Sequence, residues 1–386
     1  MAFKCGLLGE KLAHSLSPEI HRHLGEYEYR LYEKTPAEVE EFLLHGDYDV
    51  LNVTIPYKQT AAGLCDFLSP AAEMFGNVNV VVKRLDGKLY GDNTDGFGFE
   101  ALLEKVSFDP KGKKCVVLGS GGAAMTARKV LETRGASDVV TVSRTGPDNY
   151  GNLHLHADAA LVVNATPVGM FPNVDATPVS MDSFPGCEAA IDLIYNPSPT
   201  LFLQSAADRG IAAAGGMRML EAQAEKASRH MNANLYLYGA PGSGKSTFAS
   251  RLSAQKGMAL VDLDSEIEKS EGRTISDIFA AEGEAAFRKM EREALRRVSA
   301  RRNQVVALGG GALLDETSRR LAESTGRVVF IDCPRSVLVE RVAKSDARPL
   351  LAGDAERRLS HILEARREHY RSFSERIAVN VQNAGD

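Results

Sequence analysis

A glycine-rich segment in the middle of the chain constrains the fold most strongly. Residues 239–247 read Gly-Ala-Pro-Gly-Ser-Gly-Lys-Ser-Thr, which satisfies the pattern G-x-x-x-x-G-K-[ST]. The segment follows the apolar run 235–238 and precedes a helix-forming stretch, which is the context that the pattern requires. Because such a loop caps the first strand of its own domain, we expect a new domain to begin near residue 231.

The loop also predicts a ligand. Its backbone N–H groups and the following helix N-terminus can cradle phosphates. We expect Lys245 to reach the β- and γ-phosphates and Ser246 to ligate Mg²⁺. Asp262 and Asp264 end the next predicted strand, where one carboxylate can hold Mg²⁺ and the other can face an acceptor hydroxyl. The predicted metal residues are Ser246 and Asp262, and the predicted nucleotide-binding residues are Gly239, Gly242, Ser243, Gly244, Lys245, Ser246 and Thr247.

Length and composition exclude several classes of protein. The 386 residues are too many for one ordinary core, so two or three domains are expected. The net charge of −5, with both signs mixed along the chain, argues against a nucleic-acid partner. Five scattered cysteines without a CxxC pair favour a reduced cytoplasmic protein, and no apolar run approaches a membrane span. We expect small-molecule substrates and leave the oligomeric state open.

Apolar runs alternate with helical patterns, which predicts an α/β protein with parallel sheets. The loop-like pair His154 and His156 is interpreted as a surface pair rather than a zinc site. Helices are expected at 17–25, 95–106, up to about 134 after residue 123, and 216–230. Strands are expected at 3–8, 49–55, 78–82, 88–90, 114–118, 139–142, 161–164, 189–193, 235–238, 259–262, 305–308, 328–331 and 377–381.

Four further motifs follow the phosphate loop in order. They are Phe287-Arg288-x-x-Glu291, Leu308-Gly-Gly-Gly311, Arg348-Pro-Leu-Leu351 and Arg366-x-x-x-Tyr370. Paired arginines suit a carboxylate substrate, and phosphoryl transfer depends on positioning and charge neutralisation. Together with Asp262-x-Asp264, these motifs closely resemble those of shikimate kinase over about residues 233–382.

The resemblance implies roles for individual residues of this half, with ATP and Mg²⁺ as cofactors. It implies that Asp264 acts as the base for the acceptor hydroxyl or positions it. Lys245 and Arg348 would contact the phosphoryl group during its transfer. It places Arg341 near adenine. The residues it implies for shikimate binding are Arg288, Gly309, Gly310, Gly311 and Arg366.

The first half contains a second glycine-rich turn. Residues 119–123 read Gly-Ser-Gly-Gly-Ala between a buried strand and a helix, which predicts a dinucleotide turn although the pattern departs from G-x-G-x-x-G. The next strand ends in Ser143-Arg144-Thr145 and lacks the acid that holds an NAD ribose, so Arg144 can pair with a 2′-phosphate and NADP is favoured. Asp148, a few residues later, is acidic, so the selectivity between NADP and NAD stays open. The stretch 146–158 is short and rich in Gly, Asn and Pro, so a helix there is expected to be missing or reduced.

Polar motifs surround this turn on both sides. Asn52-Val-Thr54-Ile-Pro-Tyr-Lys58 and Asn93-Thr-Asp95 supply hydroxyls, amides, one lysine and one acid near element ends. With Ser15-Leu-Ser17, Asn164–Met170, Asp192–Pro197 and Gly216–Gln223, they closely resemble shikimate dehydrogenase over about residues 3–228.

This second resemblance implies that Lys58 and Asp95 form the catalytic pair for reduction of 3-dehydroshikimate by NADPH. Lys58 would protonate or stabilise the developing alkoxide, and Asp95 would orient Lys58. The implied substrate residues are Ser15, Ser17, Asn52, Thr54, Asn79, Tyr195 and Gln223. The implied or predicted NADP-binding residues are Gly119, Ser120, Gly121, Gly122, Ala123, Ser143, Arg144, Thr145, Thr166, Pro167, Val168 and Met217.

Together the two resemblances imply a fused enzyme that makes shikimate and then phosphorylates it. We expect a substrate-binding domain over 1–101 to which helix 216–230 returns, a Rossmann NADP-binding domain over 102–215, and a P-loop domain like nucleoside-monophosphate kinases over 231–386. The dehydrogenase's last helices are cut short after Gln223, and we expect the kinase half to pack where they would lie. A quinate-tolerant or NAD-using dehydrogenase fused to the kinase, and a catalytically degenerate regulatory or scaffold fusion, remain as alternatives.

Overall fold

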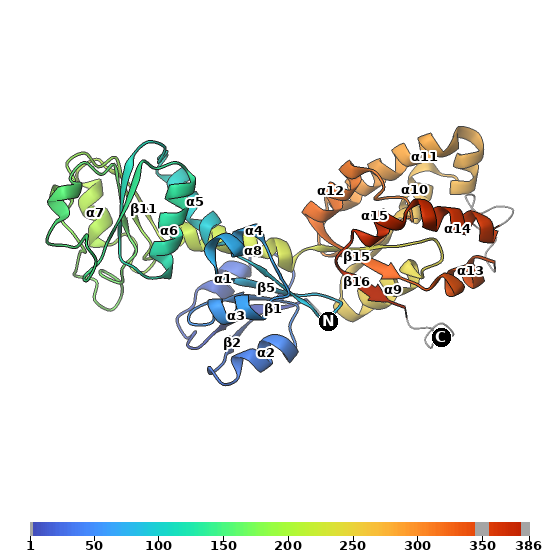
Figure 1. Ribbon diagram of the computed structural model, residues 1–386, viewed down its shortest axis with the longest axis horizontal. Helices are drawn as coiled ribbons and strands as arrows, with labels where there is room; N and C mark the ends of the chain where they lie inside the picture. Colours follow the sequence, from blue (N-terminus) through green and yellow to red (C-terminus); the bar gives the residue numbers. More distant parts are fainter. Residues whose placement is uncertain (1–2, 344–354, 380–386) are drawn as a thin grey trace.

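The computed structural model describes residues 3–343 and 355–379. They form three sheets, each in its own lobe of an elongated molecule (Figure 1). The lobe that contains the first sheet lies between the other two, and the long helix α8 (Met217–Met231) runs through it toward the third.

The first sheet has the strand order β2-β1-β3-β5-β6-β4 and is mixed. Strands β1, β2 and β3 are parallel, but β5 is antiparallel to both β3 and β6. The expectation of a parallel sheet is therefore wrong here, because the short turn around Asp86 and Gly87 joins β5 to β6 as a hairpin. The elements are β1 (Lys4–Gly9), α1 (Ser17–His21), β2 (Glu28–Glu33), α2 (Val39–His45), β3 (Val50–Val53), α3 (Lys58–Leu64), β4 (Phe67–Leu68), α4 (Pro70–Phe75), β5 (Val80–Lys83), β6 (Leu89–Asp92) and α5 (Asp95–Lys105).

Two local expectations for this sheet need correction. The helix expected at 17–25 ends at His21, because the chain must pass close to α8: a Cβ at Gly25 would lie 2.1 Å from Asn232 Oδ1. Strand β2 was not anticipated. It lies at the sheet edge and its residues, Glu-Tyr-Arg-Leu-Tyr-Glu, are half-buried or exposed, so it lacks the apolar run of a buried strand.

The second sheet is fully parallel, with the order β11-β10-β9-β7-β8. Between residues 146 and 158 only the 3-10 turn η1 (Leu153–His156) is present, so the expected lack of a regular helix there is confirmed. The other elements are β7 (Lys114–Leu118), α6 (Gly122–Thr133), β8 (Asp138–Val142), β9 (Leu161–Asn164), η2 (Met181–Ser183), β10 (Ala189–Asp192), α7 (Leu201–Ala207) and β11 (Ala212–Gly215).

The third sheet is also parallel, with the order β13-β14-β12-β15-β16. The strand expected at 377–381 is β16 (Arg376–Ala378), and residues 380 and 381 lie outside the described residues. The remaining elements are β12 (Asn234–Tyr238), α9 (Lys245–Lys256), β13 (Ala259–Asp262), α10 (Leu263–Glu271), α11 (Ile275–Ser299), β14 (Gln304–Ala307), α12 (Glu316–Thr325), β15 (Gly326–Asp332), α13 (Arg335–Ala343), α14 (Ala355–Ala365) and α15 (Arg367–Arg371).

The first and third sheets share one hydrophobic core. Side chains of β1, β3, β5 and α8 pack in a single cluster with side chains of β12, α9, β14 and β15. Polar contacts join the same two parts: Lys256 Nζ pairs with Asp49 Oδ1 at 2.5 Å, and the Leu85 N–H donates to Glu375 Oε1 at 2.9 Å. The cluster, called here the shared core, is formed by Phe3, Cys5, Val50, Val80, Val82, Ala227, Met231, Leu235, Leu237, Ala249, Leu252, Met258, Val305, Ala307, Val329 and Ile331.

Within residues 3–343 and 355–379, no helix combines the length and the apolar character needed to cross a bilayer.

Two candidate active sites

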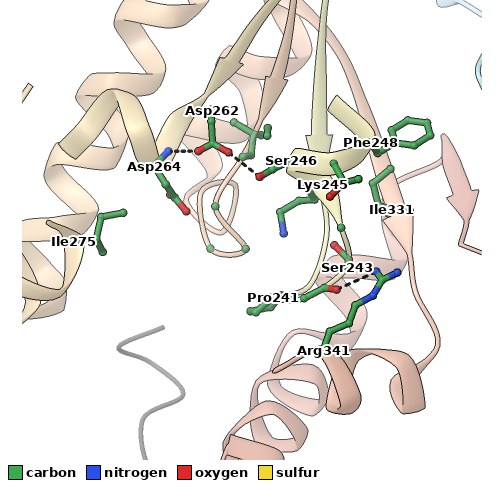
Figure 2. A pocket seen from close by; sticks show the side chains of 18 of the residues that line it. Pro241, Ser243, Lys245, Ser246, Phe248, Asp262, Asp264, Ile275, Ile331 and Arg341 are labelled. Carbon is green, nitrogen blue, oxygen red and sulfur yellow. Dashed lines mark hydrogen bonds between the residues drawn. The ribbon is translucent and has the colours of Figure 1, made fainter. Parts of the chain in front are cut away.

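A cavity of about 880 Å³ opens at the carboxyl ends of the strands of the third sheet. The phosphate loop forms one wall (Figure 2). Lys245 Nζ donates to the carbonyl oxygens of Gly239 and Ala240, each at 3.0 Å, so its ammonium lies folded against the loop that would hold phosphate. Gly242 and Gly244 both have φ of 88°, a left-handed conformation that only glycine adopts without strain.

Ser246 and Asp262 come together beside this loop. Ser246 Oγ donates to Asp262 Oδ2 at 2.7 Å, and Asp262 Oδ1 accepts from the backbone N–H of Asp264, capping α10 (Figure 2). A hydroxyl and a carboxylate are oxygen ligands of the kind that Mg²⁺ prefers, with the remaining positions left to water and phosphate. The pair therefore fits the predicted metal.

The far end of the cavity is crowded around three glycines. A Cβ at Gly309 would lie 2.7 Å from Glu291 Oε1 and 3.2 Å from Asp264 Oδ1. A Cβ at Gly311 would lie 2.6 Å from Arg288 Nη1. These positions must be glycine for the acidic and basic side chains to face the cavity together, which explains the Gly-Gly-Gly run.

Arg288 and Arg366, the two arginines predicted to bind a carboxylate, both line the cavity. Arg288 Nη1 donates to Glu291 Oε2 at 2.7 Å, and Arg366 Nη1 donates to the carbonyl of Gly310 at 2.8 Å. Glu291 is buried, and its Oε1 has no hydrogen-bond partner among the described residues. Burial raises the pKa of its carboxyl despite the opposing charge of Arg288. Glu291 was not among the predicted site residues, although its place in the Phe-Arg-x-x-Glu motif was a signal.

Arg341 and Arg348 complete the predicted set. Arg341 Nη1 lies 3.4 Å from the carbonyl oxygen of Gly242, so α13 brings it against the phosphate loop (Figure 2). Arg348 lies outside the described residues.

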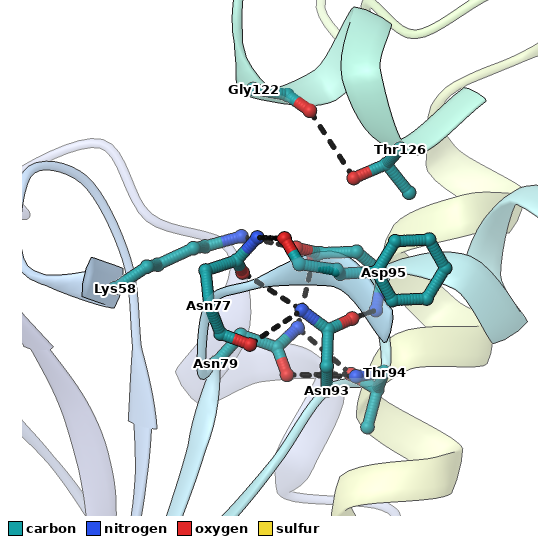
Figure 3. Close-up of polar contacts among 9 residues, drawn as sticks. Lys58, Asn77, Asn79, Asn93, Thr94, Asp95, Gly122 and Thr126 are labelled. Carbon is teal, nitrogen blue, oxygen red and sulfur yellow. Dashed lines mark hydrogen bonds and ion pairs between the residues drawn. The ribbon is translucent and has the colours of Figure 1, made fainter. Parts of the chain in front are cut away.

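The second candidate site lies at the edge of the first sheet that faces α5 and α6. Lys58 begins α3 after β3, and Asp95 begins α5 after β6. Because β5 is antiparallel to both strands, β3 and β6 run the same way and bring these residues to one edge. Lys58 Nζ donates to Asp95 Oδ2 at 2.6 Å, with side chains 27% and 9% exposed (Figure 3).

A network of amides holds the Asp95 carboxylate. Asn79 Nδ2 donates to Asp95 Oδ1 at 2.9 Å, while Asn79 Oδ1 accepts the Thr94 N–H at 2.8 Å. Asn93 Oδ1 accepts the Asp95 N–H at 2.8 Å, and Asn93 Nδ2 donates to Asn77 Oδ1 at 2.8 Å (Figure 3). Both ends of the Asn79 amide are engaged, so its contact with substrate stays a prediction and its contact with Asp95 is the observed one.

Other predicted substrate residues lie on neighbouring elements. Asn52 Oδ1 accepts from the Tyr29 hydroxyl at 2.9 Å, and the Tyr29 ring stacks on His21 with centroids 4.1 Å apart. Burial lowers the pKa of His21 to about 4 and raises the pKa of Tyr29, so both side chains are neutral near pH 7. No motif marked Tyr29 or His21, and the contact of Tyr29 with Asn52 arises only when β2 and β3 both pair with β1.

The remaining predicted substrate residues lie before and at the start of α1, just after β3, in the loop after β10 and on α8. Ser15 Oγ accepts the Ser17 N–H at 3.2 Å in the turn before α1, and the Thr54 N–H donates to the carbonyl of Leu8 at 2.9 Å. Gln223 packs against α5, where a Cβ at Gly98 would lie 2.7 Å from its Cγ. Tyr195 is partly exposed in the loop after β10.

The turn between β7 and α6 leaves bare backbone open to a ligand. Gly119 has φ of 110° and approaches the carbonyl of Ala165, where a Cβ would lie 3.0 Å from the oxygen. No atom of the described residues lies within 4 Å of a Cβ built on Gly121 or Gly122. An open helix N-terminus of this kind suits a pyrophosphate. Ser120 and Ala123 are exposed in the same turn.

The residues predicted to bind the 2′-phosphate of NADP lie at the end of β8. Arg144 and Thr145 are exposed there, directly after Ser143. Asp148 is held by His156, whose Nε2 lies 2.9 Å from Asp148 Oδ1. His156 is buried, so its interpretation as part of a surface pair is wrong, because the loop that contains it packs against the second sheet. No group of three potential metal-ligating side chains occurs within residues 3–343 and 355–379.

The rest of the predicted NADP-binding residues lie on the loop after β9 and at the start of α8. Thr166 Oγ1 donates to Asn164 Oδ1 at 2.7 Å, which fixes the loop that carries Pro167 and Val168. Met217 is the first residue of α8.

Comparison with known proteins identifies the family of this chain. A protein of Clostridium perfringens named shikimate dehydrogenase (NADP(+)) is 37% identical over 249 residues, which cover 59% of this chain and 91% of the relative. The chain belongs to the shikimate dehydrogenase family. The family model of the shikimate dehydrogenase substrate-binding domain matches residues 7–81, and the shikimate kinase family model matches residues 241–384.

Solved shikimate dehydrogenases are similar over the same part of the chain. A chorismate mutase/shikimate 5-dehydrogenase fusion protein from Clostridium acetobutylicum is 33% identical, with a TM-score of 0.56, covering 60% of this chain and 92% of that one. A shikimate 5-dehydrogenase from Thermus thermophilus in complex with NADP(H) and shikimate is 32% identical, with a TM-score of 0.53, covering 59% and 92%. The resemblances to both families are confirmed, as is the α/β fold class with a Rossmann-like part and a P-loop part.

Proposed function

We propose that this member of the shikimate dehydrogenase family catalyses two consecutive reactions, reduction of 3-dehydroshikimate by NADPH and phosphorylation of shikimate by ATP. The observation that carries the proposal is the meeting of Asp264, Arg288 and Arg366 around the cavity of the phosphate loop, in a chain whose first half pairs Lys58 with Asp95. The second site has the groups to bind the hydroxylated acid that the first site would make.

At the first site the proposed roles follow from the contacts. NADPH, when bound, supplies the hydride. Lys58 donates a proton to the oxygen of the reacting carbonyl, or stabilises the negative charge that develops there. Asp95 orients the Lys58 ammonium through its 2.6 Å contact. The open turn at Gly121 and Gly122 holds the pyrophosphate, and Arg144 pairs with the 2′-phosphate.

At the second site the protein positions reactants and neutralises charge. Bound Mg²⁺·ATP supplies the phosphoryl group. Lys245 faces the β- and γ-phosphates, while Ser246 and Asp262 hold the metal. Asp264 accepts the proton of the shikimate hydroxyl, and Arg288 and Arg366 bind the carboxylate of shikimate.

We also propose the domain limits 1–101 with helix 216–230, 102–215, and 231–386. The three sheets support them, since their strands fall within residues 4–92, 114–215 and 234–378. The five cysteines are all free, which supports the proposal of a reducing, cytoplasmic environment.

Two matched variants test the proposal. Wild-type protein should reduce NADP with shikimate and, in a separate assay, phosphorylate shikimate with ATP. Lys58→Ala should abolish only the first activity, and Lys245→Ala only the second. Loss of both activities in either variant would show that the two sites are not independent, and absence of both from the wild type would support the degenerate fusion.

A further inference from the structure

We infer that His230 is a positioning residue for dehydrogenation, acting through Asp92 on the turn that carries Asp95. This inference rests on the proposed function of the Lys58–Asp95 pair. His230 lies in the last turn of α8, four residues before β12 begins the kinase half. It therefore links the dehydrogenase site to the junction between the two halves.

The first link is a partly buried hydrogen bond. His230 Nε2 lies 2.8 Å from Asp92 Oδ2, and the side chains of His230 and Asp92 are 24% and 11% exposed. The other carboxylate oxygen accepts from the Ser69 hydroxyl and, at 2.8 Å, from the Asn93 N–H. His230 therefore holds one carboxylate oxygen of Asp92. The other oxygen accepts from Asn93, where the turn that leads to Asp95 begins.

The second link runs from Asp92 to the catalytic pair. The Asp92 carbonyl accepts the Asn79 N–H at 3.0 Å, and Asn79 Nδ2 donates to Asp95. Asn93, fixed through its own N–H by Asp92, accepts the Asp95 N–H on its side-chain oxygen at 2.8 Å. Two routes of hydrogen bonds thus converge on Asp95, whose carboxylate accepts from Lys58.

His230 and Asp92 also line a cavity of about 610 Å³ between the two halves. The opposite wall belongs to the kinase half and includes Arg319, Arg327 and Glu375. Arg229, next to His230, lines the same cavity but is exposed. The kinase half therefore borders the side chain on which the dehydrogenase turn depends, and Arg229 offers a neighbouring control position.

The effect should appear in turnover rather than in binding. A carboxylate that loses one of its two anchored oxygens can rotate, and a displacement of about 1 Å in a catalytic group can cost about 100-fold in rate. Because Asp92 keeps its contacts with Ser69 and Asn93, we expect a partial loss of about 10- to 100-fold.

Three variants test the inference: His230→Leu, which removes the donor, His230→Gln, which keeps an N–H donor on a flexible side chain, and Arg229→Leu as the control. The kcat and KM values for shikimate and NADP are measured together with kinase activity on the same samples. His230→Leu should lower dehydrogenase kcat about 10- to 100-fold, with both KM values and kinase activity near wild type. His230→Gln should recover most of the loss, and Arg229→Leu should match the wild type.

Equal dehydrogenase kcat in His230→Leu and wild type would overturn the inference, as would an equal loss in His230→Leu and His230→Gln. A second readout needs no substrate: the rate at which an amine-acylating reagent modifies Lys58, followed by mass spectrometry. Loosening the Lys58–Asp95 pair should speed this modification in His230→Leu but not in His230→Gln or Arg229→Leu. If wild-type protein lacks dehydrogenase activity, the proposed function fails, and the Lys58 labelling rates alone decide the role of His230.

Discussion

The shared core predicts that the dehydrogenase and kinase activities are lost together on heating when it is weakened. Met231 is the best probe because it ends α8, is 1% exposed, and belongs to the cluster formed by both the first and third sheets. Met231→Ala removes a buried side chain without adding a polar group. The substitution should leave a cavity between the two halves rather than inside either one.

The expected size of the effect distinguishes joint from separate unfolding. Methionine-to-alanine changes in cores cost about 2–5 kcal/mol. At about 2.1 cal/mol/K of unfolding entropy per residue, 386 residues unfolding together give about 0.8 kcal/mol/K, so a loss of about 3 kcal/mol lowers the midpoint by about 4 °C. If only residues 231–386 unfolded, the same loss would lower their midpoint by about 9 °C.

Residual activity after short incubations over a range of temperatures gives one midpoint for each reaction. In Met231→Ala both midpoints should fall by a similar amount of about 4 °C. Met125→Ala is the matched control, because Met125 is 57% exposed on α6, and its midpoints should stay within about 1 °C of wild type. A large fall of the kinase midpoint with an unchanged dehydrogenase midpoint, or the reverse, would refute the coupling through the shared core.

Parts of the fold with strong local signals could be predicted from the sequence. The phosphate loop at 239–247 and its preceding strand form a continuous motif, and Asp262 ends the next strand in the chain, so their arrangement follows from local sequence signals. Buried strands such as β7 and β12 carry unbroken apolar runs. Strand β2 does not, because a sheet edge leaves its side chains half-exposed, and only pairing with β1 defines it.

Contacts between elements far apart in the chain could not be predicted. His230 lies 138 residues from Asp92, and Tyr29 lies 23 residues from Asn52 on another strand. Neither pair forms a motif, because the spacing is set by how α8 and β2 pack rather than by local sequence. His156 shows the same limit, since its partner Asp148 is close in sequence but its burial depends on the surrounding loop.

Four further outcomes test individual parts of the two sites. Arg144→Ala should lower kcat/KM for NADP about 10- to 100-fold and leave that for NAD unchanged, because a charge-assisted contact with the 2′-phosphate is lost; equal effects on both cofactors would contradict this role. Glu291→Ala should raise the kinase KM for shikimate about 10-fold without changing that for ATP, since Arg288 loses a 2.7 Å partner; an unchanged KM would exclude this positioning. Burial would raise the pKa of Asp92, but the hydrogen bond and charge of His230 outweigh it and lower that pKa. A carboxyl whose pKa is lowered in the folded state stabilises the fold at pH values above its pKa in the unfolded chain, about 3.9. This stabilisation is lost as the pH falls through the pKa of the folded state. The difference in urea midpoint between wild type and Asp92→Asn should therefore be large at pH 7 and shrink below about pH 4. Unlabelled shikimate added during the coupled reaction should dilute labelled intermediate in full proportion; incomplete dilution would show direct transfer.

The separation of the two sites explains why free exchange of shikimate is expected. From Gln223, which we propose for the dehydrogenase site, to Met231, α8 advances about 12 Å, and β12 then spans about 16 Å before the phosphate loop begins. These elements carry the chain away from the second sheet (Figure 1), so we expect shikimate to leave the first site before it reaches the second. Fusion instead stabilises the first sheet, because the kinase half packs against it and buries its apolar side chains. Val50, Val80 and Val82 are buried in the shared core, and each contributes about 1.5–3 kcal/mol relative to an exposed side chain. A dehydrogenase ending at Met231 would lose the cover that β12, α9, β14 and β15 supply, so the kinase half acts as a structural part of the enzyme that precedes it.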